Sequence, residues 1–241
     1  MASSFPPRLK LRKSPRQARA TATLDAIFEA AIQVLVTDGP QRLTTTRVAE
    51  RAGVSVGTMY QYLPHKQALF YALNDRYLRV LADKVESACL ARHGGPIGEM
   101  VEALVTTYWN AKTERPEVTR ALYRSVVELD NEALIEDFAG RVDAATAAMF
   151  ASASDAVFAD LPIVNLTVLS TIFGTVRSVF ERNLPVPISS AVHDHLILMC
   201  NAYLEAFKIP PPGASAERER TTGSGPQVAM PALYGPPQPL G

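Results

Sequence analysis

The segment from Leu43 to Phe70 constrains the fold of this chain more than any other stretch. Its first half carries a helical apolar stripe made of Val48, Ala49 and Ala52. Gly53 follows, at a position where a positive φ costs glycine little. Ser55 is a suitable N-cap for a second helix, on which Met59 and Leu63 lie four residues apart and can pack against the first. Two short helices joined by a tight turn predict a helix-turn-helix, whose second helix is shaped to enter the major groove of DNA.

The outward-facing side chains of this segment fit that use. We expect this set to comprise Thr44, Thr45, Thr46, Arg47, Ser55, Thr58, Tyr60, Gln61, Tyr62 and Lys66. Hydroxyl, amide and cationic groups donate to phosphates or read base edges. Gly57 leaves the second helix without a side chain, so that backbone and base can approach closely. A polar helical hairpin would account for any single residue, but the whole run in register favours DNA binding.

The residues from about Leu24 to Leu73 resemble the TetR family of bacterial transcriptional regulators. The similar stretches are IFEAAIQVLVTDG and TTTRVAERAGVSVGTMYQYLPHKQAL. The resemblance implies an all-α fold, with an N-terminal three-helix helix-turn-helix domain and a C-terminal helical domain for ligand binding and dimerisation. It also implies a homodimer that binds a palindromic operator, usually represses, and is released by a small ligand.

The resemblance also implies roles for single residues. It implies base-facing positions at Val56, Gly57, Thr58 and Gln61, and DNA-backbone contacts at Thr45, Arg47, Tyr60, Tyr62 and Lys66. The chain departs from the family pattern at Leu63, His65 and Gln67, where Phe, a small capping residue and an acid are frequent. We expect His65 to cap the following helix less well than Ser or Asp would.

The charge distribution agrees with a nucleic-acid module attached to a different body. Residues 1–70 hold ten Lys and Arg against four acids, although the whole chain has a formal net charge of zero. The N-terminal third is therefore basic and the remainder acidic, a pattern typical of a DNA-binding domain joined to another domain.

Composition argues against several other classes of protein. Cys89 and Cys200 are far apart, so we expect neither a disulfide framework nor a zinc site, and a reducing cytoplasm is the simplest setting. The N-terminus lacks the apolar run of a signal peptide. The uncharged run Leu161–Val176, the longest within the expected helices, is too short and too polar to favour a membrane span. We expect no cofactor and no metal.

The chain divides into four segments. Residues 1–14 read as a disordered basic arm, either a solubilising tail or an arm that reaches the phosphates or minor groove. Residues 15–75 are the expected DNA-binding domain, whose first helix begins at Ser14-Pro15. Residues 76–208 are the expected effector-binding and dimerisation domain, and a long helix over 65–90 joins the two. Residues 209–241 form a Pro/Gly-rich tail that lacks the apolar density of a core.

Periodicity predicts only helices in the body, with no strand signals. The expected helices are 97–112, one that begins near Pro116, 131–152, 163–183 and 189–208. The last two are the dimerisation candidates, because the family pairs through its last two helices. They carry Leu166, Leu169, Ile172, Phe173, Val176, Phe180, Val192, Leu196, Met199, Tyr203 and Phe207. The alternative is that these helices are simply part of the protomer's core.

A small hydrophobic or aromatic effector would suit the body. Candidate lining residues are Tyr108, Trp109, Tyr123, Phe138, Phe173 and Arg177. The aromatic members are equally consistent with an ordinary core. Arg177 stands in an otherwise apolar helix, where a guanidinium needs an anion or a carboxylate partner, unless it is exposed or paired across a dimer.

Two other classes of function fit the sequence less well. An enzyme is disfavoured because the four histidines lack partners at helical spacing and no phosphate loop or nucleophile elbow stands out. An interaction protein that has lost DNA binding is disfavoured by the intact hydroxyl and basic set between Thr45 and Lys66. The sequence leaves open the operator, the effector and the choice between repressor and activator.

Overall fold

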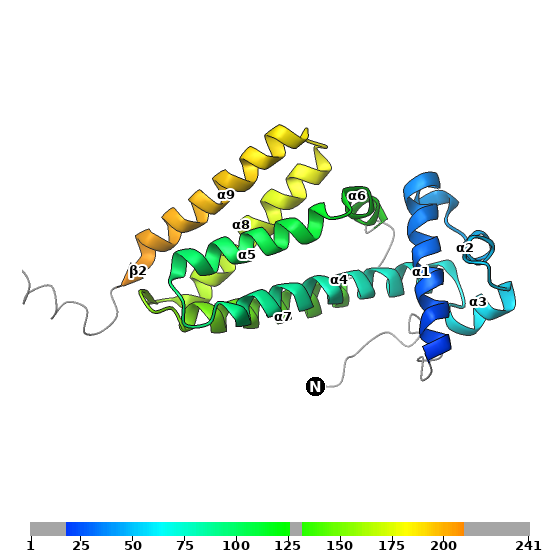
Figure 1. The fold of residues 1–241 in the computed structure, drawn as a ribbon, viewed down its shortest axis with the longest axis horizontal. Coiled ribbons are helices and arrows are strands. Elements are labelled where there is room, and N and C mark those ends of the chain that lie inside the picture. The colour runs from blue at the N-terminus through cyan, green and yellow to red at the C-terminus, as the bar shows by residue number, and fades with distance from the viewer. Residues whose placement is uncertain (1–17, 126–131, 210–241) are drawn as a thin grey trace, which may run out of the picture.

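The computed structural model describes residues 18–125 and 132–209. It shows a small helical head beside an elongated helical body (Figure 1). The head contains α1 (Ala18–Asp38), the 3-10 turn η1 (Pro40–Arg42), α2 (Thr45–Ala52) and α3 (Val56–Tyr62). The body contains α4 (Lys66–Ala91), α5 (Ile97–Thr113), α6 (Pro116–Ser125), α7 (Glu132–Ala151), β1 (Val157–Phe158), α8 (Leu161–Glu181), α9 (Val186–Phe207) and β2 (Lys208–Ile209). The all-α fold expected from the sequence is confirmed.

The turn of the helix-turn-helix is built from local caps. The Thr44 side chain accepts a hydrogen bond from the backbone N–H of Arg47 and begins α2. Gly53 ends α2 in the left-handed region, with φ of 69°. The Ser55 side chain accepts from the N–H of Thr58 at 3.0 Å and begins α3. The roles predicted for Gly53 and Ser55 are therefore confirmed.

One helix, α4, belongs to two separate cores. Its first part, from Ala68 to Leu73, is buried with α1, α2 and α3 in the core of the head. Its later part contributes Leu81, Val85 and Cys89 to the body core, where it packs between α5 and α7. A 26-residue helix is about 39 Å long. The long helix expected over 65–90 is thus confirmed as the rod that joins head and body.

The short helix α6 packs against the head, although it lies in the body part of the sequence. Its buried Val118, Ala121 and Leu122 complete the core of the head rather than that of the body. In Figure 1, α6 lies next to α1 at the end of the body, and the two helices are in contact. Sequence periodicity predicts the helix α6 itself. It does not predict that α6 packs into the core of the head, because this depends on contacts between residues far apart in the sequence.

The body differs from the sequence-based expectation in one detail. Val157 and Phe158 form an antiparallel two-residue pair with Ile209 and Lys208. This pair ties the α7–α8 connection to the end of α9. Two residues are too few to give an alternating pattern in the sequence, so the pair was not predicted. The expected arm over 1–14, the helix start at Ser14-Pro15 and most of the 209–241 tail lie outside the described residues.

Two of the described helices are long and apolar enough to cross a membrane by length and composition. They are Ala20–Asp38 and Leu161–Glu181, with mean hydropathies of 1.3 and 1.5. Each lines a core, of the head and of the body respectively. Core helices of this kind satisfy the same criterion, so their apolar character is explained by packing.

Gly53→Ala should destabilise the protein by about 1–2 kcal/mol, because an alanine in the left-handed region carries that steric cost. Urea unfolding followed by circular dichroism measures it. Gly140→Ala is the matched control. Gly140 is exposed within α7, its φ is not positive, and an added Cβ meets no atom within 4 Å. The control should gain about 0.5–1 kcal/mol. Equal effects of the two substitutions would contradict the role given to Gly53.

Candidate nucleic-acid interface and the interior of the body

The second helix of the motif presents a mixed polar surface to solvent. Val56, Gly57 and Gln61 are exposed on α3, and Tyr60 is 43% exposed. Thr58 is half-buried, with its hydroxyl 2.8 Å from that of Ser55. The expected base-facing residues therefore lie together on α3. A Cβ on Gly57 would meet only the Ser55 hydroxyl, at 3.7 Å, so the position has room for a small side chain within the protomer.

Two of the expected DNA-backbone residues do not face outward. Thr45 and Tyr62 are only 8% and 9% exposed, so the prediction that both face solvent is wrong. Tyr62 lies three residues after the buried Met59 and therefore on the same face of α3. The Thr45 hydroxyl donates to the Tyr60 hydroxyl at 3.5 Å. Both side chains thus pack beneath the exposed surface of the motif. The hydroxyl of Thr45 also helps to orient the exposed side chain of Tyr60.

The remaining basic residues flank α3. Arg47 is exposed and pairs with Asp38 at 3.1 Å. The ammonium of Lys66, at the start of α4, lies 5.4 Å from the centre of the Phe70 ring. His65 caps α4 directly, because its Nδ1 accepts from the N–H of Ala68 at 3.1 Å. This residue was expected to be a poor cap, yet its ring supplies the acceptor that the helix start needs.

The residues expected to line an effector pocket pack largely against one another. Tyr108, Trp109 and Phe138 are buried. The Phe173 ring lies 4.8 Å from Tyr108 and 5.7 Å from Phe138, measured between ring centres. Arg177 has a 61% exposed side chain and bonds to Glu181 one turn along α8 at 2.6 Å. Arg177 is therefore exposed and has a carboxylate partner within its own helix.

A buried lysine that sequence reasoning missed lies beside these aromatic residues. Lys112 on α5 is 2% exposed. Its Nζ lies 4.7 Å from the ring centre of Tyr77, 5.5 Å from that of Tyr108 and 5.0 Å from that of Tyr123. Helical spacing could have found it, because Lys112 stands four residues after Tyr108 on the buried face of α5.

Burial dominates the titration of this cluster. It lowers the pKa of Lys112 from its ordinary value to about 7, since removal from water disfavours the charged form. Burial likewise raises the pKa of Tyr123 to about 12 and that of Tyr108 well above its ordinary value. Among the described residues, no Asp or Glu forms an ion pair with Lys112.

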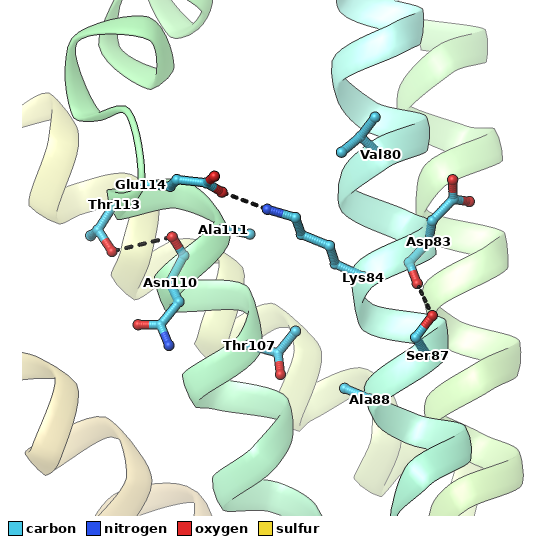
Figure 2. Close-up of a pocket in the computed structure, with 10 residues that line it drawn as sticks. All are labelled: Val80, Asp83, Lys84, Ser87, Ala88, Thr107, Asn110, Ala111, Thr113 and Glu114. Atoms are coloured by element: carbon cyan, nitrogen blue, oxygen red, sulfur yellow. Dashed lines mark hydrogen bonds and ion pairs between the residues drawn. The ribbon is translucent and has the colours of Figure 1, made fainter.

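An open groove runs between α4 and α5, with a volume of about 810 Å³ (Figure 2). Figure 2 shows Lys84 of α4 and Glu114, the residue after α5, meeting across this groove; their charged atoms are 2.5 Å apart. A smaller cavity of about 220 Å³ lies deeper, between α1, α4, α5 and α6. Groove and cavity share four lining residues: Val80, Lys84, Ala111 and Glu114. Within the described residues, no cluster of three or more His, Cys, Asp or Glu is arranged to hold a metal ion.

Two family models match the chain, and together they cover both of its parts. Residues 27–73 match the model of the bacterial regulatory proteins of the tetR family. Residues 96–204 match the tetracyclin repressor-like C-terminal domain.

Similar curated proteins include a nucleoid occlusion factor and a transcriptional repressor. The chain is 32% identical over 97 residues to the nucleoid occlusion factor SlmA of Actinobacillus pleuropneumoniae, covering 40% of this chain and 47% of that protein. It is 32% identical over 117 residues to the HTH-type transcriptional repressor KstR of Mycolicibacterium smegmatis, covering 48% and 54%. The chain thus spans about half the length of these relatives.

Solved structures share the fold at low sequence identity. A TetR-family regulator from Mesorhizobium loti superposes with a TM-score of 0.65 at 14% identity, covering 80% of this chain and all of that one. The SmeT–triclosan complex gives a TM-score of 0.60 at 16% identity, covering 87% of this chain and all of that one. With head, body and sequence models in agreement, this chain belongs to the TetR family of transcriptional regulators.

Proposed function

We propose that this protein is a cytoplasmic, homodimeric repressor that binds a palindromic operator and is released by a small molecule. The observation that carries the proposal is the exposed face of α3, held in place by the Ser55 cap and the Gly53 turn. DNA binding as such follows from the family. Two similar proteins, the transcriptional repressor KstR and SmeT in complex with triclosan, support the finer statement.

Within that proposal, the burial of each side chain of the motif decides whether it contacts the bases, contacts the DNA backbone or supports the interface from inside. Val56, Gly57, Thr58 and Gln61 face the bases, because they share the solvent side of α3. Arg47, Tyr60 and Lys66 contact the DNA backbone with donors at the edges of the motif. Thr45 and Tyr62 are left to support the interface from within, since their side chains are almost wholly buried.

Exposed apolar side chains on the last two helices support the dimer. Of the eleven candidates, Leu169, Ile172, Val176, Phe180 and Leu196 are buried in the protomer's own core. Other apolar side chains on these helices remain about half exposed or more, namely Ile163, Leu166, Leu198, Met199 and Phe207. On α9, Leu198 and Met199 share an outward stripe with Ala191, His195 and Ala202. A second copy would cover this stripe, and two heads about 34 Å apart would reach successive major grooves.

The test of the whole proposal is binding to the DNA upstream of the protein's own gene, across a salt series and against random DNA. We expect a footprint of two protomers on a palindrome, with an affinity at least about a thousandfold above that for random DNA. Binding no better than to random DNA, in a genome-wide selection of fragments as well, would overturn it.

Base reading predicts a change of sequence preference in Gln61→Ala. Each lost base contact should cost about 1–3 kcal/mol on the selected operator, with little change on random DNA. Competition binding with single-base operator variants measures it. An unchanged preference in both Gln61→Ala and Thr58→Ala would remove the base-reading role from α3.

Phosphate contact predicts a different result for Lys66→Ala. Binding should weaken on every sequence, and the slope of log affinity against log salt should fall by about 1. Lys208→Ala is the control, because Lys208 pairs with Glu205 at the far end of the body. The assignment fails if the two variants show the same slope.

The dimer predicts that Leu198→Glu gives a monomer in analytical ultracentrifugation, because a carboxylate would be buried against the partner without a counter-charge. Leu90→Glu is the matched control on α4, since Leu90 is 76% exposed and Leu198 is 65% exposed. A dimer that survives both Leu198→Glu and Leu166→Glu would place the interface elsewhere.

A further inference from the structure

Lys112 is the most unusual side chain in the described part of the body. A buried ammonium is costly unless it is paired, and a Met of similar length would fill the same space without that cost. Three tyrosine rings from α4, α5 and α6 surround its Nζ, and their faces attract the cation. Beyond Tyr123, the Arg177 guanidinium of α8 lies 6.0 Å from the ring centre, but it is exposed and already paired with Glu181. Among the described residues no Asp or Glu pairs with Lys112, so an anion is the partner that this ammonium lacks.

The inner cavity reaches this cluster. Tyr77 and Thr119 line the cavity, and both also contact Lys112: the Tyr77 ring lies beneath Nζ, and the Thr119 hydroxyl donates to the Lys112 carbonyl oxygen at 2.8 Å. The hydroxyls of Tyr77 and Thr119 are 3.1 Å apart, and Lys112 itself is not among the residues that line the cavity. A rotation of Tyr77 that opens this hydrogen bond would join the cavity to the ammonium.

The cavity also has an approach from solvent. The groove of Figure 2 shares the Lys84–Glu114 ion pair with the cavity, and this exposed pair is weak enough to open. The rest of the cavity wall is largely apolar, with Ile32 contributed by α1. A volume of about 220 Å³ suits a small molecule with one ring or a short chain.

We propose that Lys112 is the counter-charge for an acidic effector, a small aromatic or apolar carboxylic acid that enters from the α4–α5 groove and binds against Tyr77 and Thr119. This proposal rests on the ligand-controlled regulation proposed above and names the chemical class of the ligand. The acid group pairs with the ammonium inside the tyrosine cluster, and the apolar part fills the cavity.

The site is placed to act on the head. Ile32 of α1 lines the cavity, and so does Arg115, whose guanidinium bonds both carboxylate oxygens of Glu29 on α1 at 3.0 and 3.1 Å. A ligand that pushes the cavity-lining residues apart would change how α1 packs against α6. The acid thereby favours one arrangement of the heads over another, which is the requirement for a ligand-induced shift.

The experiment is isothermal titration calorimetry of the full-length protein with benzoate, phenylacetate and 3-phenylpropanoate, each compared with its carboxamide. The amide keeps the size and shape of the acid but removes its charge. We expect at least one acid to bind at least about tenfold more tightly than its amide, as a hydrogen-bonded charge in a buried site provides. At pH 7 the protein should also take up about half a proton when that acid binds, because the bound carboxylate stabilises the ammonium of a lysine whose pKa is about 7.

Two variants identify the counter-charge. Lys112→Met should lose both the preference for the acid and the proton uptake, and it should fold at least as stably as the parent, which thermal unfolding checks. Lys84→Met removes the cation that lines both the groove and the cavity. Preference lost in Lys84→Met but kept in Lys112→Met would put the acid at the entrance and overturn the proposal.

Acids that bind no better than their amides would also overturn it. These results are independent of operator binding, which is measured on the same preparation without ligand. A protein that binds its operator but not the acids refutes only the ligand class. A protein that binds the acids but no operator refutes only the proposed repressor.

Discussion

The arrangement of this protein depends on α4, because one continuous helix is buried in two cores. Burial of Leu69 and Leu73 fixes its start in the head, and burial of Leu81 and Val85 fixes the remainder in the body. A helix held at both ends by close packing cannot bend at the junction without exposing apolar surface. Movements in the body are therefore passed to the head by rotation or translation of the rod.

Helix α6 makes this junction sensitive to the body. Val118 and Leu122 give it an apolar seat in the head, whereas Arg120 bonds the Asn183 side chain near the end of α8 at 2.7 Å. The ion pairs from α1 to Arg76 and Arg115 are exposed and contribute little stability. They select an orientation, because the apolar contacts beside them tolerate sliding more easily than a bidentate guanidinium does.

The parts of the molecule that the sequence predicts well are those determined by neighbours in the chain. The caps at Ser55 and Gly53 depend on residues within one turn, and so does the helical stripe of α1. The packing of α6 against the head depends on residues far along the chain, which explains why it was missed. The burial of Tyr62 follows from its spacing of three residues from Met59, a local signal that the sequence already holds. Lys112 was missed for a different reason, since a charged residue on an apolar stripe is ordinarily read as the end of the stripe.

A buried ammonium beside the junction also explains how stability and regulation can be linked in this fold. Burial lowers the pKa of Lys112 in the folded protein to about 7. Between pH 7 and the ordinary pKa of a lysine, the unfolded chain therefore binds more protons than the folded protein does. Stability therefore rises with pH through this window, and below it the protein carries the full cost of an unpaired charge. An acid that binds Lys112 removes that cost, so part of its binding free energy is relief of a strain already present in the free protein. That relief would favour only the arrangement of α1, α4 and α6 in which the acid can reach the ammonium, and through α4 it would bias the position of the head.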